Sequence, residues 1–293
     1  MRNVLLQRGY PIQMICRGPS RSLPWQRGVC SLLLAWLLPG TGLAQDHRET
    51  GGRDEAWTLK PYSTVYKTTA RGLSMKLRRE LKVGEDGQCE LTSEGSLLVV
   101  GLSETSHFRI SDGRVTPASY IYQGSGLINR RREVHFSPDT PIIRSLYKGE
   151  WYSLPEVGHT LDRMSQQEQM RLNLLAQDEA MQEMKFKVAD GRRVRNYTLT
   201  LLGQERLQTP VGEIDTLLYK HQRQDSERLS QLWIAPDWDY LAVKILHIED
   251  GKTIEAHLIS AEINGQPVED YPARSADTAS QVSYQALGSV TPR

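Results

Sequence analysis

The densest group of aromatic side chains in the sequence surrounds Pro236. Trp233, Trp238 and Tyr240 combine apolar rings with polar tips, and such side chains suit the rim of a ligand pocket. The same residues can instead close one end of a hydrophobic core, because Pro236 has no N–H to donate and must end the strand that holds Trp233. The three aromatic residues are therefore candidate ligand-binding residues, with core packing as the alternative.

Asp162 is the acidic residue whose surroundings most resemble a functional site. It lies in the segment Thr160-Leu161-Asp162-Arg163-Met164-Ser165. A carboxylate there can bind a ligand or act in catalysis. It equally suits the start of a helix, where an Asp side chain caps free N–H groups and favours the positive end of the dipole, or a local pair with Arg163. Asp162 is a fourth candidate ligand-binding residue, and capping is its alternative role.

The sequence contains no motif of a known catalytic or metal centre. G-x-S-x-G, H-E-x-x-H and Walker motifs are missing, and the seven histidines are not spaced as metal ligands. Two basic clusters place pairs of arginines on one strand face, where they would bind phosphates or stay solvated: Arg130 with Arg132, and Arg193 with Arg195. We predict no catalytic residue, no metal and no cofactor, hence no enzyme; a hydrolase using Asp162 or a histidine is the remaining alternative.

Between residues 61 and 263 the dominant hydrophobic period is two. From Leu73 to Val83, apolar residues alternate with polar and charged ones, which places the two kinds on opposite faces of a strand. Hairpin-forming pairs separate the alternating runs: Asp86-Gly87, Asp112-Gly113, Asp190-Gly191 and Asp250-Gly251. The pattern predicts a mainly β fold, a large curved antiparallel meander that forms a half-barrel or open barrel.

One segment, from Thr160 to Gln177, has a helical period instead. Its apolar residues fall near one face, and Glu168, Arg171 and three glutamines occupy the rest. We expect one amphipathic helix packed against the sheet or inside it. Such a helix would cover an open mouth or edge, which otherwise invites aggregation.

Residues 1–44 have the features of a secretory signal peptide, with either Met1 or Met14 as the start. They hold five arginines and no acidic residue, then an apolar run of ten residues and a small-residue site ending at Ala44. Ten residues are too few to cross a bilayer, which needs about 20. Cys89 is the only cysteine beyond this leader, and we expect it to be a small buried hydrophobe rather than a reactive thiol.

The rest of the chain is mildly acidic. Without five arginines the basic count falls from 36 to 31, against 35 acidic residues, so no general attraction to nucleic acid is expected. No later segment is long and apolar enough to predict a transmembrane span. Residues 45–60 are expected to be a flexible lead-in, residues 61–263 a single β-rich domain, and residues 264–293 a disordered tail.

The mature region resembles the bacterial exported family known as domain of unknown function 3108 (DUF3108), from about Pro61 to Ala261. The resemblance lies in the strand Tyr62–Ala70, the Thr160–Ser165 helix start, and two further segments, Gly203–Thr216 and Leu232–Ile245. It implies a periplasmic protein of Gram-negative bacteria with a curved sheet around a helix, similar to periplasmic lipoprotein carriers. The family supplies no functional residue and no activity.

Two functions fit this sequence. The first is a binding module for a lipid, lipoprotein or other apolar envelope ligand, which requires that the inner face of the sheet be larger than the helix can fill. The second is a structural or interaction protein of the cell envelope with a fully packed core and protein partners. The sequence indicates neither the ligand nor the oligomeric state.

Overall fold

The computed structural model describes residues 58–70, 73–97, 100–126, 129–177, 180–225, 229–249 and 252–272. All of them belong to the second of two compact units, Glu49–Arg293. The leader, most of the lead-in and residues 273–293 lie outside the described residues, so the signal peptide remains a prediction. Among the described residues, no helix combines the length and apolar character needed to cross a bilayer.

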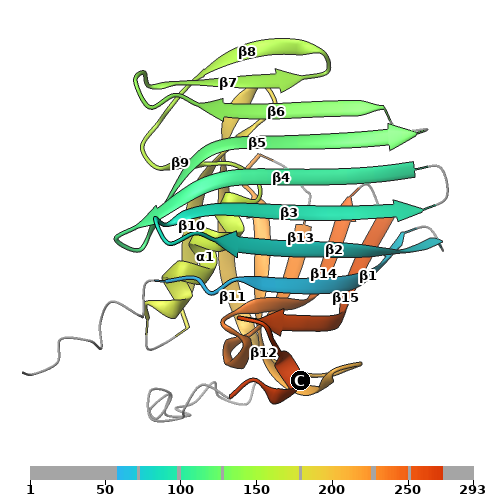
Figure 1. The fold of residues 1–293 in the computed structure, drawn as a ribbon. Coiled ribbons are helices and arrows are strands. Elements are labelled where there is room, and N and C mark those ends of the chain that lie inside the picture. The colour runs from blue at the N-terminus through green and yellow to red at the C-terminus, as the bar shows by residue number, and fades with distance from the viewer. Residues whose placement is uncertain are drawn as a thin grey trace, which may run out of the picture. The chain divides into compact units, whose positions relative to one another are not determined.

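Eight strands precede the helical segment, in agreement with the predicted meander (Figure 1). They are β1 (Tyr62–Ala70), β2 (Leu73–Val83), β3 (Gln88–Leu97), β4 (Val100–Ser111), β5 (Arg114–Gly126), β6 (Arg130–Phe136), β7 (Ile142–Tyr147) and β8 (Glu150–Pro155). A short strand β9 (Thr160–Leu161) and the helix α1 (Ser165–Leu175) follow. The remaining elements are β10 (Glu183–Asp190), β11 (Arg193–Thr209), β12 (Gly212–Arg223), β13 (Leu229–Ala235), the 3-10 helix η2 (Pro236–Trp238), β14 (Leu241–Glu249), β15 (Lys252–Ile263), β16 (Gln266–Pro267) and the 3-10 helix η3 (Val268–Asp270).

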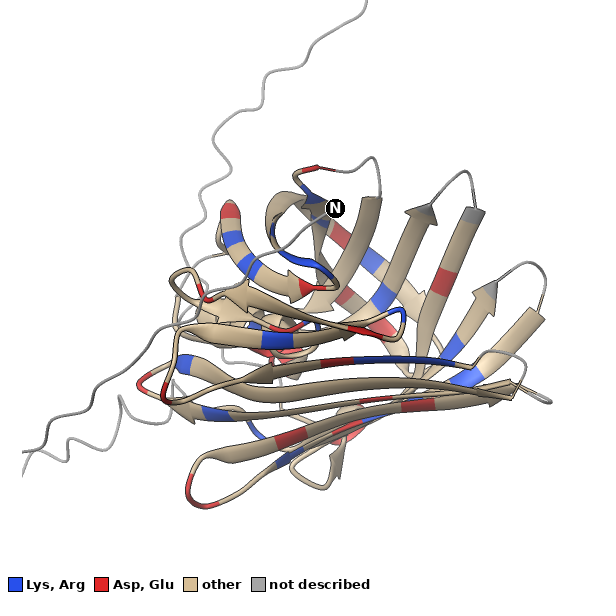
Figure 2. Ribbon diagram, turned by 90° about the horizontal axis from the view of Figure 1, so that it is seen from above, with Lys and Arg blue, Asp and Glu red and all other residues tan. Residues whose placement is uncertain are grey.

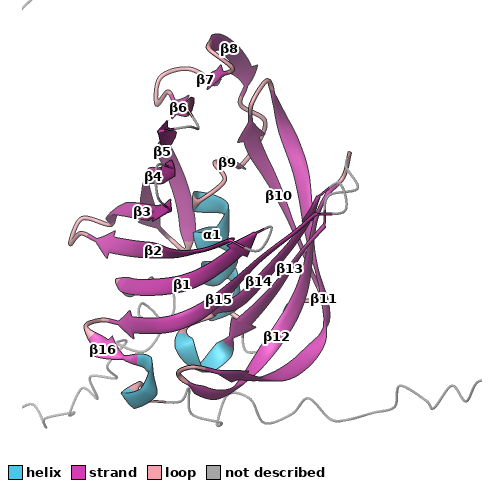
Figure 3. Ribbon diagram, turned by 90° about the vertical axis from the view of Figure 1, so that its right-hand side faces the viewer, coloured by secondary structure: helices cyan, strands magenta, loops and turns pink. Residues whose placement is uncertain are grey.

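These strands form one sheet in which sequential strands are neighbours. The exception is the pairing of β1 with β15, which joins the first half of the sheet to the second and leaves β8 and β9 at its ends. The sheet is curved, so that its two halves face each other with α1 between them (Figure 3). The predicted fold class, a large curved antiparallel sheet with one helix inside it, is confirmed.

Tight turns explain why sequential strands pair. Asp112 and Gly113 both have positive φ, 51° and 69°, as do Lys148 and Gly149, which is the backbone that two-residue hairpins require. The pair Asp250-Gly251 lies outside the described residues. Asn264 and Gly265 form another such turn, with φ of 52° and 76°, which leads into β16 and η3. Residues 264–272, which the sequence analysis assigns to a disordered tail, are therefore ordered against β15.

The core lies between α1 and the inner face of the sheet. Cys89 is 4% exposed there, as expected of a buried hydrophobe, and burial raises the pKa of its thiol to about 12. The helix itself differs from the expected amphipathic one: it begins at Ser165 rather than Thr160, and its polar residues are buried as well as its apolar ones.

Hydrogen bonds to the sheet explain why α1 buries polar side chains. The Glu168 carboxylate accepts a hydrogen bond from the Tyr62 hydroxyl at 2.8 Å and forms ion pairs with Arg79 at 3.3 Å and Arg171 at 2.7 Å. The Gln169 side chain accepts a hydrogen bond from the backbone N–H of Val115 at 2.8 Å. Buried polar groups are tolerated when they are paired in this way. The helix is thus fixed inside the sheet by polar contacts on several sides.

Candidate functional site

The helix does not fill the space inside the sheet. A cavity of about 430 Å³ remains between α1 and the strands around it. Its lining residues come from α1, from the segment before it, and from seven strands: Glu104, Arg132, Arg163, Gln166, Gln167, Met170, Val188, Asp190, Tyr197, Leu199, His221, Arg223, Ser230, Leu232, Ile245 and His247. The inner face of the sheet is therefore larger than the helix covers.

One wall of the cavity is apolar. It is formed by Met170 of α1 and by side chains from β10, β11, β13 and β14: Val188, Leu199, Leu232 and Ile245. Leu232 and Ile245 are partners in the antiparallel register, so their side chains lie next to each other on the inner face. This wall offers a surface for an apolar ligand.

Backbone pairing leads from the cavity to two further apolar side chains. His247 of β14 pairs with Ile254 of β15, position 254 pairs with position 70 of β1, and position 70 pairs with Leu73 of β2. Residues paired in register share a face, and Leu73 lies on the same face of β2 as Arg79, which pairs with Glu168 of the helix. Leu73 and Ile254 are nevertheless 61% and 42% exposed. The inner face thus carries exposed apolar side chains beyond the part that α1 covers.

Other residues of the same lining, called the charged wall below, carry charges and lie partly on the same strands as the apolar ones. Three arginines, Arg132, Arg163 and Arg223, lie with two carboxylates, Glu104 and Asp190. Basic and acidic residues are otherwise interspersed along the strands (Figure 2). The lining of the cavity therefore combines apolar side chains with a group of charged side chains whose net charge is positive.

His221 of β12 also lines the cavity and is neutral at physiological pH. Its ring stacks on Tyr197 with the centroids 5.0 Å apart, and its Nε2 atom lies 3.0 Å from Nε2 of Gln166. Burial, with Arg163 and His247 nearby, lowers the pKa of His221 to about 4. The group therefore acts as a polar, uncharged part of the lining. Within the described residues no cluster of His, Cys, Asp and Glu has the arrangement of a metal site.

Asp162 lies outside this lining and has the contacts of a cap. It is fully buried, and its Oδ1 accepts hydrogen bonds from the backbone N–H groups of Met164 at 2.8 Å and Ser165 at 3.0 Å. Its Oδ2 accepts a hydrogen bond from Ser106 of β4 at 2.9 Å. These contacts fix the turn that begins α1 and tie it to the sheet.

None of the three aromatic candidates lines the cavity, and Trp233 lies on the other face of β13 from the lining residue Leu232. Trp233 is 5% exposed, donates a hydrogen bond from Nε1 to Glu205 at 2.6 Å and stacks under the Lys244 ammonium at 4.6 Å. Trp238 and Tyr240 are buried in the core at η2, where Pro236 begins a turn of 3-10 helix that directs the chain inwards. The ligand-binding role of all three stays a prediction without support from the cavity, and the core-packing alternative accounts for the burial of Trp238 and Tyr240.

Sequence reasoning found part of the charged wall. It singled out Arg132 as one of a pair on a strand face, but left open whether that face is solvated. Arg132 lies two residues before Val134 on the same strand, so the two side chains share a face. Val134 is 3% exposed, which makes this the inner face. The spacing of Arg132 and Val134 could therefore have predicted that Arg132 points inwards. The sequence around Glu104, Asp190 or Arg223 does not show that these three residues line the same cavity.

Comparison with solved structures finds likenesses of low sequence identity. A β-barrel-like protein of domain of unknown function DUF1849 from Brucella abortus has 9% identity and a TM-score of 0.48, over 70% of this chain and 98% of that one. MucB has 13% identity and a TM-score of 0.31, over 75% of this chain and 60% of MucB. The MucA/MucB complex of Pseudomonas aeruginosa has 10% identity and a TM-score of 0.16, over 71% of this chain and 90% of that one. These scores give no basis for assigning a function.

The family comparison covers most of the described domain. No curated protein matches the sequence. Residues 60–258 match the family described as Protein of unknown function (DUF3108), a range that agrees with the resemblance seen in the sequence. The chain therefore belongs to the DUF3108 family.

Proposed function

We propose that this protein is a non-enzymatic binding module that takes the apolar part of a lipid, lipoprotein or similar envelope ligand into the cavity beside α1. The observation that carries the proposal is the cavity of about 430 Å³ that the helix leaves open against the inner face. This volume lies within the roughly 300–1,000 Å³ of ordinary ligand sites. The alternative, a structural protein with a fully packed core, predicts no such space between the helix and the sheet.

The surface around the cavity supports an elongated ligand. The row of paired positions from His247, which lines the cavity, through Ile254 and position 70 to Leu73 runs across β14, β15, β1 and β2. Each methylene group that such a ligand buries contributes about 0.8 kcal/mol. An acyl chain that lies along this row would cover Leu73 and Ile254, whose exposure is otherwise unfavourable.

The setting is proposed to be the periplasm of a Gram-negative bacterium. The leader pattern of residues 1–44 supports export, and the family resemblance supports the compartment. The proposal assigns no reaction, although the lining includes a hydroxyl beside an imidazole, with Oγ of Ser230 2.7 Å from Nδ1 of His247.

A saturable fluorescence increase of Nile red tests the proposed cavity. We expect the wild-type protein to bind one dye molecule, and Leu232→Trp, which fills the cavity from β13, to reduce the affinity about tenfold or more. Gln231→Trp is the matched control, since residue 231 lies on the opposite face of the same strand and should leave binding unchanged. Equal dye binding by both variants, or none by the wild type, would contradict the proposal.

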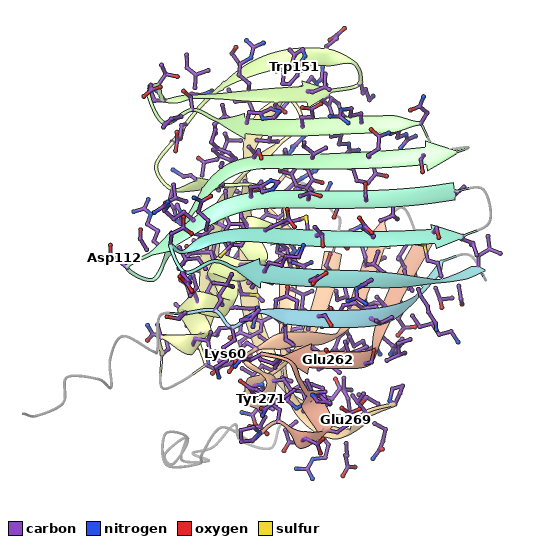
Figure 4. All side chains as sticks on the ribbon, viewed as in Figure 1. Lys60, Asp112, Trp151, Glu262, Glu269 and Tyr271 are labelled. Atoms are coloured by element: carbon purple, nitrogen blue, oxygen red, sulfur yellow. The ribbon has the colours of Figure 1, made fainter. Side chains whose placement is uncertain are left out.

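The alternative function, an interaction protein of the envelope, is favoured by one surface. Ile142 on β7 and Trp151 on the end strand β8 are 44% and 47% exposed, and Trp151 lies at the edge of the sheet (Figure 4). Exposed apolar side chains at a sheet edge suit a protein partner. Site-specific crosslinking in cells from position 151, with the exposed turn position 112 as control, tests it: a discrete adduct specific to position 151 is the expected sign of a partner.

A further inference from the structure

The charged wall of the cavity contains two arginines without a carboxylate partner. Arg163 precedes α1 and Arg132 belongs to β6, and both line the cavity. Among the described residues, neither guanidinium forms an ion pair. Arg132 instead stacks on the rings of Tyr122 and Tyr147, with 5.9 Å and 5.3 Å from its Cζ to the ring centroids.

The other charges of this wall are engaged elsewhere. The Arg223 guanidinium forms an ion pair with Asp225 at 2.7 Å. Asp190 lies 3.5 Å from Nε of Arg195, and Glu104 accepts a hydrogen bond from the Tyr120 hydroxyl at 2.9 Å. Two cations therefore face the cavity without a carboxylate at ion-pair distance.

The groups around Arg163 favour the charged form of its guanidinium. Arg163 lines the cavity, and its side chain is exposed to water although many protein atoms lie near it. Burial lowers the pKa of Arg163, but Tyr120, Glu104 and Asp190 raise it, and the net direction is upwards. The guanidinium is charged at every physiological pH.

We infer that the ligand of this cavity is an amphiphile with an anionic head group, a phosphate or a carboxylate, that Arg132 and Arg163 bind while its apolar tail lies against Leu232 and Ile245. This inference rests on the proposed function and adds the charge of the head group. Guanidinium groups suit it because their planar N–H donors match the oxygens of a phosphate or a carboxylate. A neutral ligand would exclude water from the cavity and give neither guanidinium an ion-pair partner.

Isothermal titration calorimetry of the mature protein with four probes tests the inference. Three probes share a twelve-carbon chain and differ in charge: dodecyl phosphate, dodecanoate and dodecyltrimethylammonium, each below its micelle concentration. Inorganic phosphate is the fourth. We expect the two anionic amphiphiles to bind about tenfold more tightly than the cationic one, and inorganic phosphate to bind more weakly than dodecyl phosphate.

Two variants locate the site. The double variant Arg132→Gln/Arg163→Gln should lose the preference for anions and keep the affinity for the shared chain. Arg78→Gln, on an exposed position of β2, is the control and should keep the preference. The wild-type series tests the inference even if the double variant does not fold.

The outcomes separate the two proposals. Equal binding of all three chains, unchanged by the double variant, overturns the head-group inference and leaves the proposed function standing. Binding of inorganic phosphate as tightly as dodecyl phosphate supports an anion site and overturns the apolar part of the proposed function. No binding by any chain overturns both.

Discussion

At the scale of single residues, Asp162 has surroundings typical of a functional site, but its contacts are those of a structural cap. Its fully buried carboxylate accepts hydrogen bonds from two backbone N–H groups of the turn before α1 and from Ser106 of β4. Sequence reasoning offered capping and ligand binding as alternatives, and local spacing alone could not choose between them. The contact with Ser106 joins residues 56 positions apart, so only the folded sheet reveals that this cap also anchors the helix.

Replacing Asp162 should therefore cost stability. Asp162→Ala leaves two buried N–H groups without an acceptor, and we expect it to lower the free energy of unfolding by about 2–4 kcal/mol in urea titrations. Asp162→Asn keeps an acceptor oxygen and should cost less. A change below about 0.5 kcal/mol for the alanine variant would contradict the capping role.

His221 should make the protein less stable in acid. Its pKa is lowered to about 4 in the folded protein from 6.5, so the unfolded chain binds the proton first. The stabilisation is complete above pH 6.5 and is lost as the pH falls towards 4, by at most about 1.4 kcal/mol per pH unit.

Unfolding of the wild type and of His221→Gln at pH 7 and at pH 4.5 measures this contribution. The variant should lose less stability between the two pH values than the wild type, because groups other than His221 affect both proteins alike. Identical pH dependence would show that His221 titrates normally in the folded protein.

At the scale of elements, α1 is fixed by a buried ionic cluster. Glu168 is 1% exposed and compensates the charges of Arg79 and Arg171. We expect Glu168→Ala to reduce stability by about 3–5 kcal/mol, since it leaves two arginines buried without a counter-charge. Glu94→Gln, on an exposed position of β3, is the control and should change stability little. Equal effects of the two variants in urea unfolding would contradict this role of the cluster.

The hairpin between β2 and β3 depends on Gly87 for two reasons. Its φ is +75°, and a Cβ at this position would lie 2.6 Å from the carbonyl oxygen of Ile110. Gly149 has a similar φ of +84° with no atom within 4 Å of such a Cβ. Gly149→Ala should cost about 1 kcal/mol from backbone conformation alone, and Gly87→Ala clearly more, because Ile110 must also shift. Equal losses in melting temperature would contradict the close approach.

At the scale of the whole molecule, the strands were predictable and the cavity was not. Alternation between Leu73 and Val83 and the turn at Asp112-Gly113 specify strands and hairpins from residues close in sequence. The cavity brings together Glu104 and Arg223, 119 positions apart, through the pairing of β1 with β15. Such an arrangement depends on the register of many strands at once, and no single segment encodes it.

The burial of polar residues on α1 was also not predictable from its sequence. Its polar residues predict a face exposed to water, but Glu168 and Gln169 are buried because the sheet supplies their partners. The period of a segment indicates which residues share a face. It does not show whether a polar face meets water or another polar surface.

Native mass spectrometry tests the central claim most directly, that the cavity holds an apolar ligand. The protein would be expressed with its leader in a Gram-negative host and purified without detergent, before and after extraction with organic solvent. The account predicts an added mass in the lipid range that disappears on extraction and is reduced in Leu232→Trp but not in Gln231→Trp. A mass equal to that of the polypeptide alone in every sample would contradict it.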